Sequence, residues 1–140
     1  MDAWINKPNY RTYISSKINK DEPFAFFDLD ETLITSYKSK NPAIFNKDPE
    51  DWIYLGDIIG KLEQLVEDRF NIVIVTNQTY LARKDGEILM VKFNNIIEDL
   101  KVWGINVSFL ISFLTGAILF INIVNRLFKI FPLATPIDLR

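Results

Sequence analysis

The stretch FAFFDLDETLITSYKSK, residues 24–40, joins a short apolar run directly to two aspartates. Its first four residues are all apolar, which is typical of a strand that is buried on both faces of a parallel sheet. Asp28 and Asp30 follow at once, separated by one leucine, and Thr32 comes two residues later. Structural need alone rarely places two carboxylates at the end of a buried strand. We therefore expect this end of the strand to perform a chemical task.

Two more strands and two helices are predicted downstream. Residues 70–78 (FNIVIVTNQ) are rich in β-branched residues, and residues 105–112 (INVSFLIS) form a third apolar run. Residues 57–69 and 85–100 carry apolar residues at helical spacing, with Asp57 placed to cap the first helix. This alternation predicts an α/β fold in which helices flank a parallel sheet with right-handed crossovers. Residues 1–23 are polar and mixed and end in a turn-like cluster, and residues 35–56 are expected to form a loop.

The composition restricts both the fold and the chemistry. The chain has 140 residues, the length of one domain, and 49% of them are hydrophobic, as in globular proteins. It contains no cysteine and no histidine, which excludes disulfides, cysteine–histidine zinc sites and histidine general bases. The net charge of −2 gives no global attraction to nucleic acid. The lack of cysteine and the polar N-terminus favour an intracellular location, in the nucleus or the cytoplasm.

Polar side chains stand at the ends of the first two predicted strands. In a parallel sheet these carboxyl ends meet at one edge, where the active sites of open α/β sheets lie. There Asp28 could attack phosphorus, and Asp30 could exchange protons with the leaving group and with water. A magnesium ion on the two carboxylates would neutralise their charge, because Mg²⁺ prefers oxygen ligands. Thr76 and Asn77 are the candidate phosphate-binding residues of the second strand.

Each polar cluster also has a purely structural interpretation. The first would be an acidic turn after a strand, and the second would be the polar end of a strand ladder. Either cluster alone favours this interpretation. The two together, at neighbouring carboxyl ends within one domain, favour a functional site.

Both clusters resemble signature motifs of a known superfamily. FFDLDETLIT resembles the first motif, D-x-D-x-T, of the haloacid dehalogenase (HAD) superfamily, and VIVTNQ resembles its second motif. Within this superfamily, the chain is similar to the 3′-phosphatase domain of polynucleotide kinase/phosphatase. Four further stretches carry the narrower resemblance: SSKI (15–18), TLITSYKSK (32–40), DWIYL (51–55) and FPLATPIDL (131–139).

The resemblance implies a Rossmann-like HAD fold with a minimal cap or none. It covers residues 15–112 well, whereas residues 113–140 are divergent or truncated. We expect residues 1–140 to form a single phosphatase domain. No G-x-x-x-x-G-K-[ST] motif is present, so the kinase half of the bifunctional enzyme is not expected in this chain.

The resemblance also implies a role for each candidate residue. Asp28 would be the nucleophile that forms an aspartyl-phosphate, and Asp30 the general acid/base. Thr76 would bind the transferring phosphate, and magnesium would sit on the Asp28 carboxylate and the Asp30 backbone carbonyl. The substrate would be a 3′-phosphate at a DNA end, as in DNA repair. Basic residues after the two motifs would form a rim that suits a polynucleotide: Lys38, Lys40, Arg83 and Lys84.

Two later motifs of the superfamily are not found in the sequence. They are a lysine that steadies the phosphoaspartate and a late acidic pair that completes the magnesium site. Ser112 stands near the position that the lysine takes in the superfamily. Lys101 and Lys129 are the nearest lysines, but the residues around them do not mark either one as the missing lysine. After Ser112 no aspartate occurs before Asp138. Loss of one such electrostatic contact lowers a rate by about a hundredfold to a thousandfold.

Three alternatives accompany the 3′-phosphatase hypothesis. One is a small-molecule phosphatase of the histidinol-phosphate or heptose-bisphosphate type. Another is a catalytically impaired remnant that acts as a binding module for nucleic acid ends or a protein. The third is a membrane-tethered protein, because residues 105–124 contain no charged residue over the length of a membrane span. For this segment we favour a buried strand followed by an apolar helix.

Overall fold

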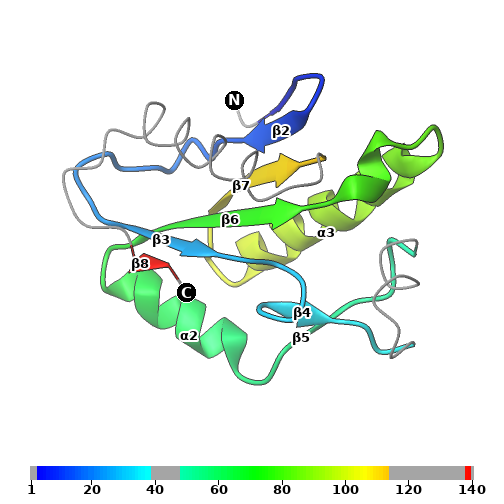
Figure 1. Cartoon of the computed structure of the whole chain (residues 1–140). Coiled ribbons are helices and arrows are strands. Elements are labelled where there is room, and N and C mark those ends of the chain that lie inside the picture. Colours follow the sequence, from blue (N-terminus) through cyan, green and yellow to red (C-terminus); the bar gives the residue numbers. More distant parts are fainter. Residues whose placement is uncertain (1–2, 39–47, 114–137, 140) are drawn as a thin grey trace.

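The computed structural model describes residues 3–38, 48–113 and 138–139 and shows a sheet with helices packed on it (Figure 1). In the described residues the sheet has six strands in the order β1-β2-β7-β6-β3-β8. The three central strands β7, β6 and β3 are parallel, and β8 pairs in parallel with β3. The strands span Trp4–Asn6 (β1), Tyr10–Tyr13 (β2), Phe24–Phe27 (β3), Asn71–Asn77 (β6), Val107–Ser112 (β7) and Asp138–Leu139 (β8).

The predicted α/β fold with a mostly parallel sheet is confirmed, but short strands also occur in the N-terminal segment, for which no strand was predicted, and at the predicted loop of residues 35–56. In the N-terminal segment, β2 pairs antiparallel with β7, and β1 pairs antiparallel with β2. β4 (Ile34–Thr35), at the start of the predicted loop, and β5 (Ile53–Tyr54), near its end, form a separate two-stranded antiparallel sheet. Strands of two to four residues carry little periodic signal, and pairing with neighbouring strands rather than local propensity stabilises them.

Both predicted helices are present, and they lie on the same face of the sheet (Figure 1). They are α2 (Ile58–Glu67) and α3 (Leu89–Val102). The second begins later than predicted, because two short 3-10 helices, η1 (Thr79–Ala82) and η2 (Gly86–Ile88), precede it. The predicted capping by Asp57 is wrong: this residue stands at the N-cap position of α2, but its side chain makes no capping hydrogen bond.

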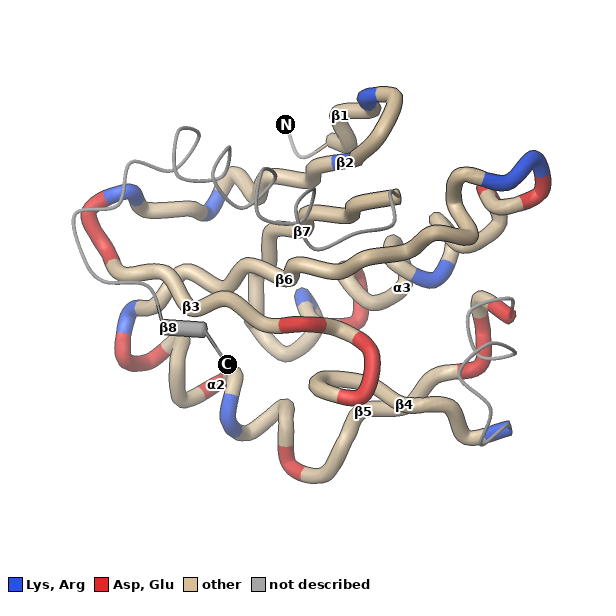
Figure 2. Tube along the Cα trace, in the orientation of Figure 1, with Lys and Arg blue, Asp and Glu red and all other residues tan. Residues whose placement is uncertain are grey.

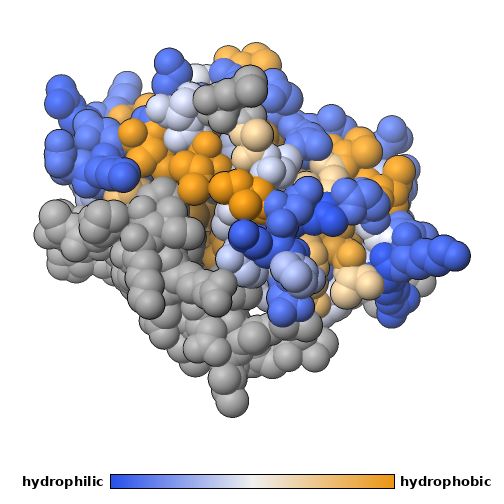
Figure 3. All heavy atoms as spheres, turned by 90° about the horizontal axis from the view of Figure 1, so that it is seen from above, coloured by the Kyte–Doolittle hydropathy of each residue, from blue (hydrophilic) through white to orange (hydrophobic). Residues whose placement is uncertain are grey.

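Apolar residues are buried on both faces of the sheet. The larger cluster lies between the sheet and the helices, where Phe27 and Ile74 meet Leu62 of α2 and Phe93 of α3. The side chains that alternate with these strand residues form a smaller cluster on the opposite face: Phe24, Phe26, Val73, Val75 and Leu110. A space-filling view from above shows apolar residues gathered in the middle of this side, with polar residues along part of their border (Figure 3). The strands are thus buried on both faces, as their continuous apolar runs predict.

No helix in the described part of the chain is long and apolar enough to cross a membrane. Of the uncharged stretch 105–124, residues 107–112 form the buried strand β7. The remainder from residue 114 onward lies outside the described residues.

The loop between β6 and α3 is fixed at two points. A Cβ atom at Gly86 would lie 2.0 Å from the carbonyl oxygen of Tyr80, so the backbones of η1 and η2 pack directly on each other. Arg11 of β2 binds Glu87 of η2 through two parallel hydrogen bonds of 2.8 and 2.6 Å. The unpredicted strand β2 therefore holds the loop that follows β6.

This ion pair predicts a pH dependence of stability. Hydrogen bonds from Arg11 hold the pKa of Glu87 below its ordinary value of 4.5. The carboxylate thus stabilises the folded state above pH 4.5, and this contribution is lost as the pH falls through the lowered pKa. Glu87→Gln should lower the free energy of unfolding at pH 7 by about 0.5–1 kcal/mol, with a difference that shrinks below pH 4.5. Urea unfolding from pH 3 to pH 7, with Glu63→Gln as the exposed control, tests this; a constant difference would contradict it.

Candidate active site

The turn after β3 presents two aspartates at the carboxyl end of the sheet. Leu29 between them is fully buried, and its carbonyl oxygen accepts hydrogen bonds from the backbone N–H groups of Thr32, Leu33 and Ile34. One residue of this turn has a left-handed backbone conformation, and it is Glu31, with φ 59°. Asp28 stays exposed, and its Oδ1 accepts a 2.8 Å hydrogen bond from the N–H of Leu29. The buried leucine anchors a turn whose flanking carboxylates face solvent or the neighbouring strand end.

Asp30 is joined to the end of β6 through one side-chain amide. The Nε2 of Gln78 donates to Asp30 Oδ2 at 2.7 Å and to Thr76 Oγ1 at 2.9 Å. The backbone N–H of Gln78 donates to the carbonyl oxygen of Ser112 at 2.7 Å, which fixes it to the end of β7. Thr76 and Gln78 are both only 1% exposed. The three central strand ends therefore meet in one buried polar network.

The structure places the predicted phosphate-binding residues on different sides of β6. Thr76 is buried and lies in the same network as Asp30. Asn77, the next residue, is exposed, because successive side chains of a strand point to opposite faces. Gln78 was not among the predicted site residues, although its spacing of two from Thr76 on a predicted strand indicates that the two side chains share a face.

The two aspartates are close enough to influence each other electrostatically. Partial burial raises the pKa of Asp28, and the negative charge of Asp30 raises it further, while the hydrogen bond from the N–H of Leu29 acts in the opposite direction. A pair of like charges of this kind favours binding of a cation or a proton. The arrangement is therefore a carboxylate pair with a preference for positive charge.

Lys92 of α3 is the buried cation of this region, and sequence analysis missed it. Its side chain is 0% exposed, and its Nζ lies 3.7 Å from Asp30 Oδ1. Burial lowers the pKa of Lys92, whereas the carboxylates of Asp30 and Asp51 act against that shift. A signal was present in the sequence: Lys92 falls at helical spacing on the apolar stripe of α3, where a charged residue is unexpected.

Asp51 organises the segment that follows β4. It is 1% exposed and accepts hydrogen bonds from the hydroxyl of Ser36 and from the backbone N–H groups of Tyr37 (3.0 Å) and Lys38 (2.9 Å). Burial raises the pKa of Asp51, but these hydrogen bonds outweigh burial and lower it. The DWIYL stretch thus supplies the buried acceptor that holds the chain near Lys38.

The predicted basic rim is partly described. Figure 2 shows basic residues on the loop between β6 and α3 and acidic residues between β3 and β4. Lys38 pairs with Asp48 at 3.0 Å, and the guanidinium of Arg83 lies 5.3 Å from the ring centre of Tyr80. Lys84 is exposed. Lys40, the fourth residue predicted for the rim, lies outside the described residues.

Magnesium is compatible with the acidic pair. The described residues contain no group of three or more aspartate, glutamate, histidine or cysteine side chains that could hold a metal. Mg²⁺ in proteins often uses one or two carboxylates and keeps several water molecules, so two aspartates meet its minimum requirement. Partial burial is the main cause of the raised pKa of Asp28, and the negative charge of Asp30 adds to it; a bound cation would balance that charge.

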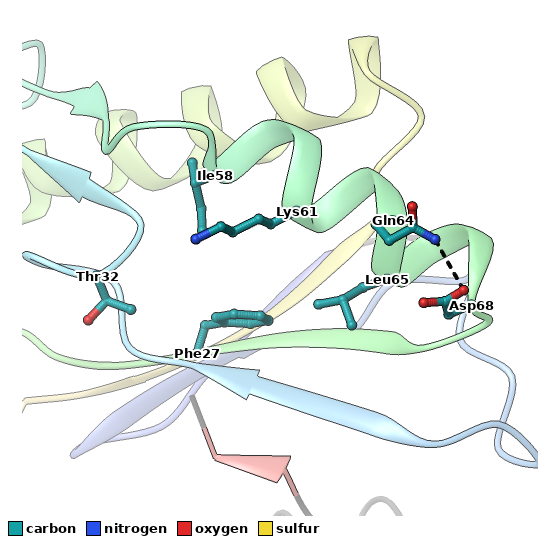
Figure 4. Close-up of a pocket in the computed structure, with 7 residues that line it drawn as sticks. All are labelled: Phe27, Thr32, Ile58, Lys61, Gln64, Leu65 and Asp68. Carbon is teal, nitrogen blue, oxygen red and sulfur yellow. Dashed lines mark hydrogen bonds between the residues drawn. The ribbon is translucent and has the colours of Figure 1, made fainter.

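A cavity of about 530 Å³ lies beside the acidic turn, between β3 and α2 (Figure 4). Lys61 points along α2 into this space, and a hydrogen bond of 3.2 Å joins Gln64 to Asp68 at its far end. Neither aspartate of the pair lines the cavity, so it is adjacent to the candidate site and separate from it. Its lining residues are Phe27, Thr32, Ile58, Lys61, Gln64, Leu65 and Asp68.

Comparison with known sequences links this site to a phosphatase family. The sequence model of the family described as polynucleotide kinase 3 phosphatase matches residues 23–118. The bifunctional polynucleotide phosphatase/kinase of Schizosaccharomyces pombe is 37% identical over 87 residues, which are 60% of this chain and 21% of that protein. An uncharacterized 20.8 kDa protein of Autographa californica nuclear polyhedrosis virus is 35% identical over 112 residues, 77% of this chain and 57% of that protein. The chain thus spans about a fifth and just over half of these relatives.

Solved structures show the same fold. A HAD-like phosphatase from Mesorhizobium loti has a TM-score of 0.69 with 17% identity, over 92% of this chain and 68% of that one. The D,D-heptose 1,7-bisphosphate phosphatase from B. bronchiseptica, complexed with magnesium and phosphate, has a TM-score of 0.62 and 17% identity. That match covers 79% of this chain and 64% of the other. The predicted Rossmann-like HAD fold is confirmed by these likenesses.

The hydrogen bonds of Gln78 predict how substitutions at the end of β6 change the stability, and the exposed neighbour Asn77 provides the control. Gln78→Met should cost about 1–3 kcal/mol of unfolding free energy, because it leaves Asp30 and Thr76 without their shared donor. Asn77→Ala, at the exposed adjacent position, should change it by less than about 0.5 kcal/mol. Urea unfolding of both variants gives the comparison, and equal effects of the two substitutions would show that the network contributes nothing to stability.

Proposed function

The chain belongs to the polynucleotide kinase 3 phosphatase family, and from this premise we propose that it removes the 3′-phosphate from DNA ends. The observation that carries the proposal is the contact of Asp30, two residues after Asp28, with Gln78 and through it with Thr76, at the carboxyl ends of adjacent parallel strands. This edge is where open α/β sheets bind and transform substrates. Residues 1–140 would form one phosphatase domain.

In the first step, Asp28 is the nucleophile. A carboxylate oxygen of Asp28 forms a bond to phosphorus while the bond from phosphorus to the 3′-oxygen breaks. The leaving 3′-oxygen takes a proton from Asp30 and becomes the 3′-hydroxyl. Asp28 suits the role because its carboxylate is exposed, whereas Asp30 is held by Gln78 and is less accessible.

In the second step, water resolves the aspartyl-phosphate. Asp30, now ionised, removes a proton from water as the water oxygen bonds to phosphorus. The bond between phosphorus and Asp28 breaks, which releases inorganic phosphate and restores the nucleophile. The Gln78 amide fixes Asp30 at 2.7 Å and so keeps the same carboxylate in place for both proton transfers.

The remaining groups bind and orient the substrate. The hydroxyl of Thr76 is 2.9 Å from Gln78 Nε2 and is proposed to bind a phosphoryl oxygen. Arg83 and Lys84 on the exposed loop after β6, with Lys38 after β4, are proposed to attract the polynucleotide backbone. A bound Mg²⁺ would offset negative charge on the phosphoryl group, held by the Asp28 carboxylate and the Asp30 backbone carbonyl.

A second candidate function is binding of nucleic acid ends with little turnover. It is favoured by the small number of acidic ligands, since no group of three occurs among the described residues. Weak metal binding would leave the transferring phosphoryl group poorly neutralised. Turnover, rather than binding, separates the two functions.

The nucleophile can be tested directly with a 3′-phosphorylated oligonucleotide. Asp28→Asn should abolish phosphate release, by more than about a thousandfold, because an amide cannot form the aspartyl-phosphate. Asp21→Asn, at an exposed position before β3, should retain full activity. Phosphate release is followed with magnesium and again after chelation, with a 5′-phosphorylated oligonucleotide and heptose bisphosphate as alternative substrates. Tight binding of oligonucleotide without phosphate release by the unmodified chain would replace the phosphatase proposal with the end-binding function.

A further inference from the structure

A lysine that is fully buried on the apolar stripe of a helix demands an explanation. Lys92 of α3 is 0% exposed, and its neighbours on the same stripe are Leu89, Phe93 and Ile96. Burying an ammonium group is costly unless a carboxylate compensates it, and an apolar residue of similar volume is often equally or more stabilising. Stability alone would therefore favour methionine or leucine at this position, and the charge points to another task.

The surroundings of Lys92 show which groups its charge serves. Its Nζ lies 3.7 Å from Asp30 Oδ1, while Gln78 donates to the other oxygen of the same carboxylate at 2.7 Å. The negative charge of Asp51 also favours the charged form of Lys92. Asp51 already accepts three hydrogen bonds from the segment after β4, whereas Asp30 Oδ1 accepts none from the described residues. Asp30 is thus the carboxylate that depends on Lys92.

The charges at the strand ends need such a cation. Asp28 and Asp30 together carry two negative charges, and a phosphate monoester would bring up to two more. Among the described residues, Lys92 is the buried cation that contacts Asp30 of this pair. A positive charge fixed in a poorly hydrated position acts more strongly on nearby anions than one on the exposed rim.

We infer that Lys92 is the charge-compensating residue of this site: from α3 it positions Asp30 and provides the positive charge that lets a phosphate approach the acidic pair. This inference rests on the proposed function. The superfamily lysine is not found near Ser112, and the inference assigns its positive charge to Lys92 of α3, the helix between β6 and β7. Lys92 acts on the substrate indirectly, through its contact with Asp30 and through the electrostatic field of its charge. It is therefore a positioning residue.

The first experiment separates turnover from substrate binding. Lys92→Met keeps the length and apolar stem of the side chain and should fold, but kcat on a 3′-phosphorylated oligonucleotide should fall by about a hundredfold to a thousandfold. KM should rise by about tenfold, in step with the weaker phosphate binding, while the exposed rim still binds the strand, so the loss in kcat exceeds the loss in substrate binding. Retention of kcat within threefold would overturn the inference.

The absence of cysteine from the chain allows the charge to be restored chemically. Lys92→Cys is unfolded in denaturant, alkylated with 2-bromoethylamine and refolded, which rebuilds a lysine-like ammonium at this position alone. The same protein alkylated with iodoacetamide carries a neutral amide and is the matched control. Circular dichroism confirms that both forms are folded. The aminoethyl form should recover at least a tenth of the unmodified kcat and the amide form should not; equal activities would refute a role for the charge.

Binding of inorganic phosphate provides a measurement that does not need turnover. With magnesium present, calorimetry should show about tenfold or weaker phosphate affinity for Lys92→Met and for the amide form than for the unmodified chain, with recovery in the aminoethyl form. If the unmodified chain hydrolyses no substrate but shows this pattern, the proposed function fails and the inference on Lys92 stands as anion binding. If phosphate affinity is the same in all forms, or absent in all, the inference on Lys92 is wrong.

Discussion

The parallel pairing of β3 with β6 is the constraint on which the site depends. The register runs from Phe24 opposite Asn71 to Phe27 opposite Ile74, so both strands end at the same edge of the sheet. Asp30 and Gln78 are 48 residues apart in the chain, and this register brings their side chains within 2.7 Å. A slip of one residue would turn Thr76 and Gln78 to the exposed side and Asn77 to the buried one.

Much of this architecture is predictable from the sequence because the central strands are continuous apolar runs and the helices have clear periodicity. The acidic pair and Thr76 were selected for the same reason, since strand ends in a parallel sheet share an edge. Residues whose importance comes from long-range contacts were not selected. Gln78 belongs to the site because it contacts Asp30 and the end of β7. Lys92 belongs to it because α3 approaches the turn after β3. The pairing of β1 and β2 also comes from tertiary contacts, since their few residues have weak propensities.

The site combines a rigid interior with an accessible surface. Gln78, Thr76 and Lys92 are buried around Asp30, whereas Asp28 and the basic residues after β6 are exposed. The low dielectric of the interior strengthens each hydrogen bond of this network, so the Gln78 amide holds Asp30 in place, although Asp30 Oδ1 and Gln78 Oε1 have no hydrogen-bond partner among the described residues. Exposed charges act over longer distances and are screened by salt. The interior therefore fixes the geometry around Asp30, and the surface governs which molecules arrive.

The direct backbone contact at Gly86 has an evolutionary consequence. Any side chain at this position would collide with the carbonyl of Tyr80, so the shape of the loop is tied to one glycine and to the buried Leu81. Arg83 and Lys84 project from that fixed backbone into solvent, whereas Asp85 accepts a hydrogen bond from the Tyr80 hydroxyl within the loop. Substitutions at Arg83 and Lys84 alter the charge that a ligand meets while leaving the scaffold intact. Ligand preference in this lineage can therefore diverge by drift at the surface, without a compensating change in the sheet.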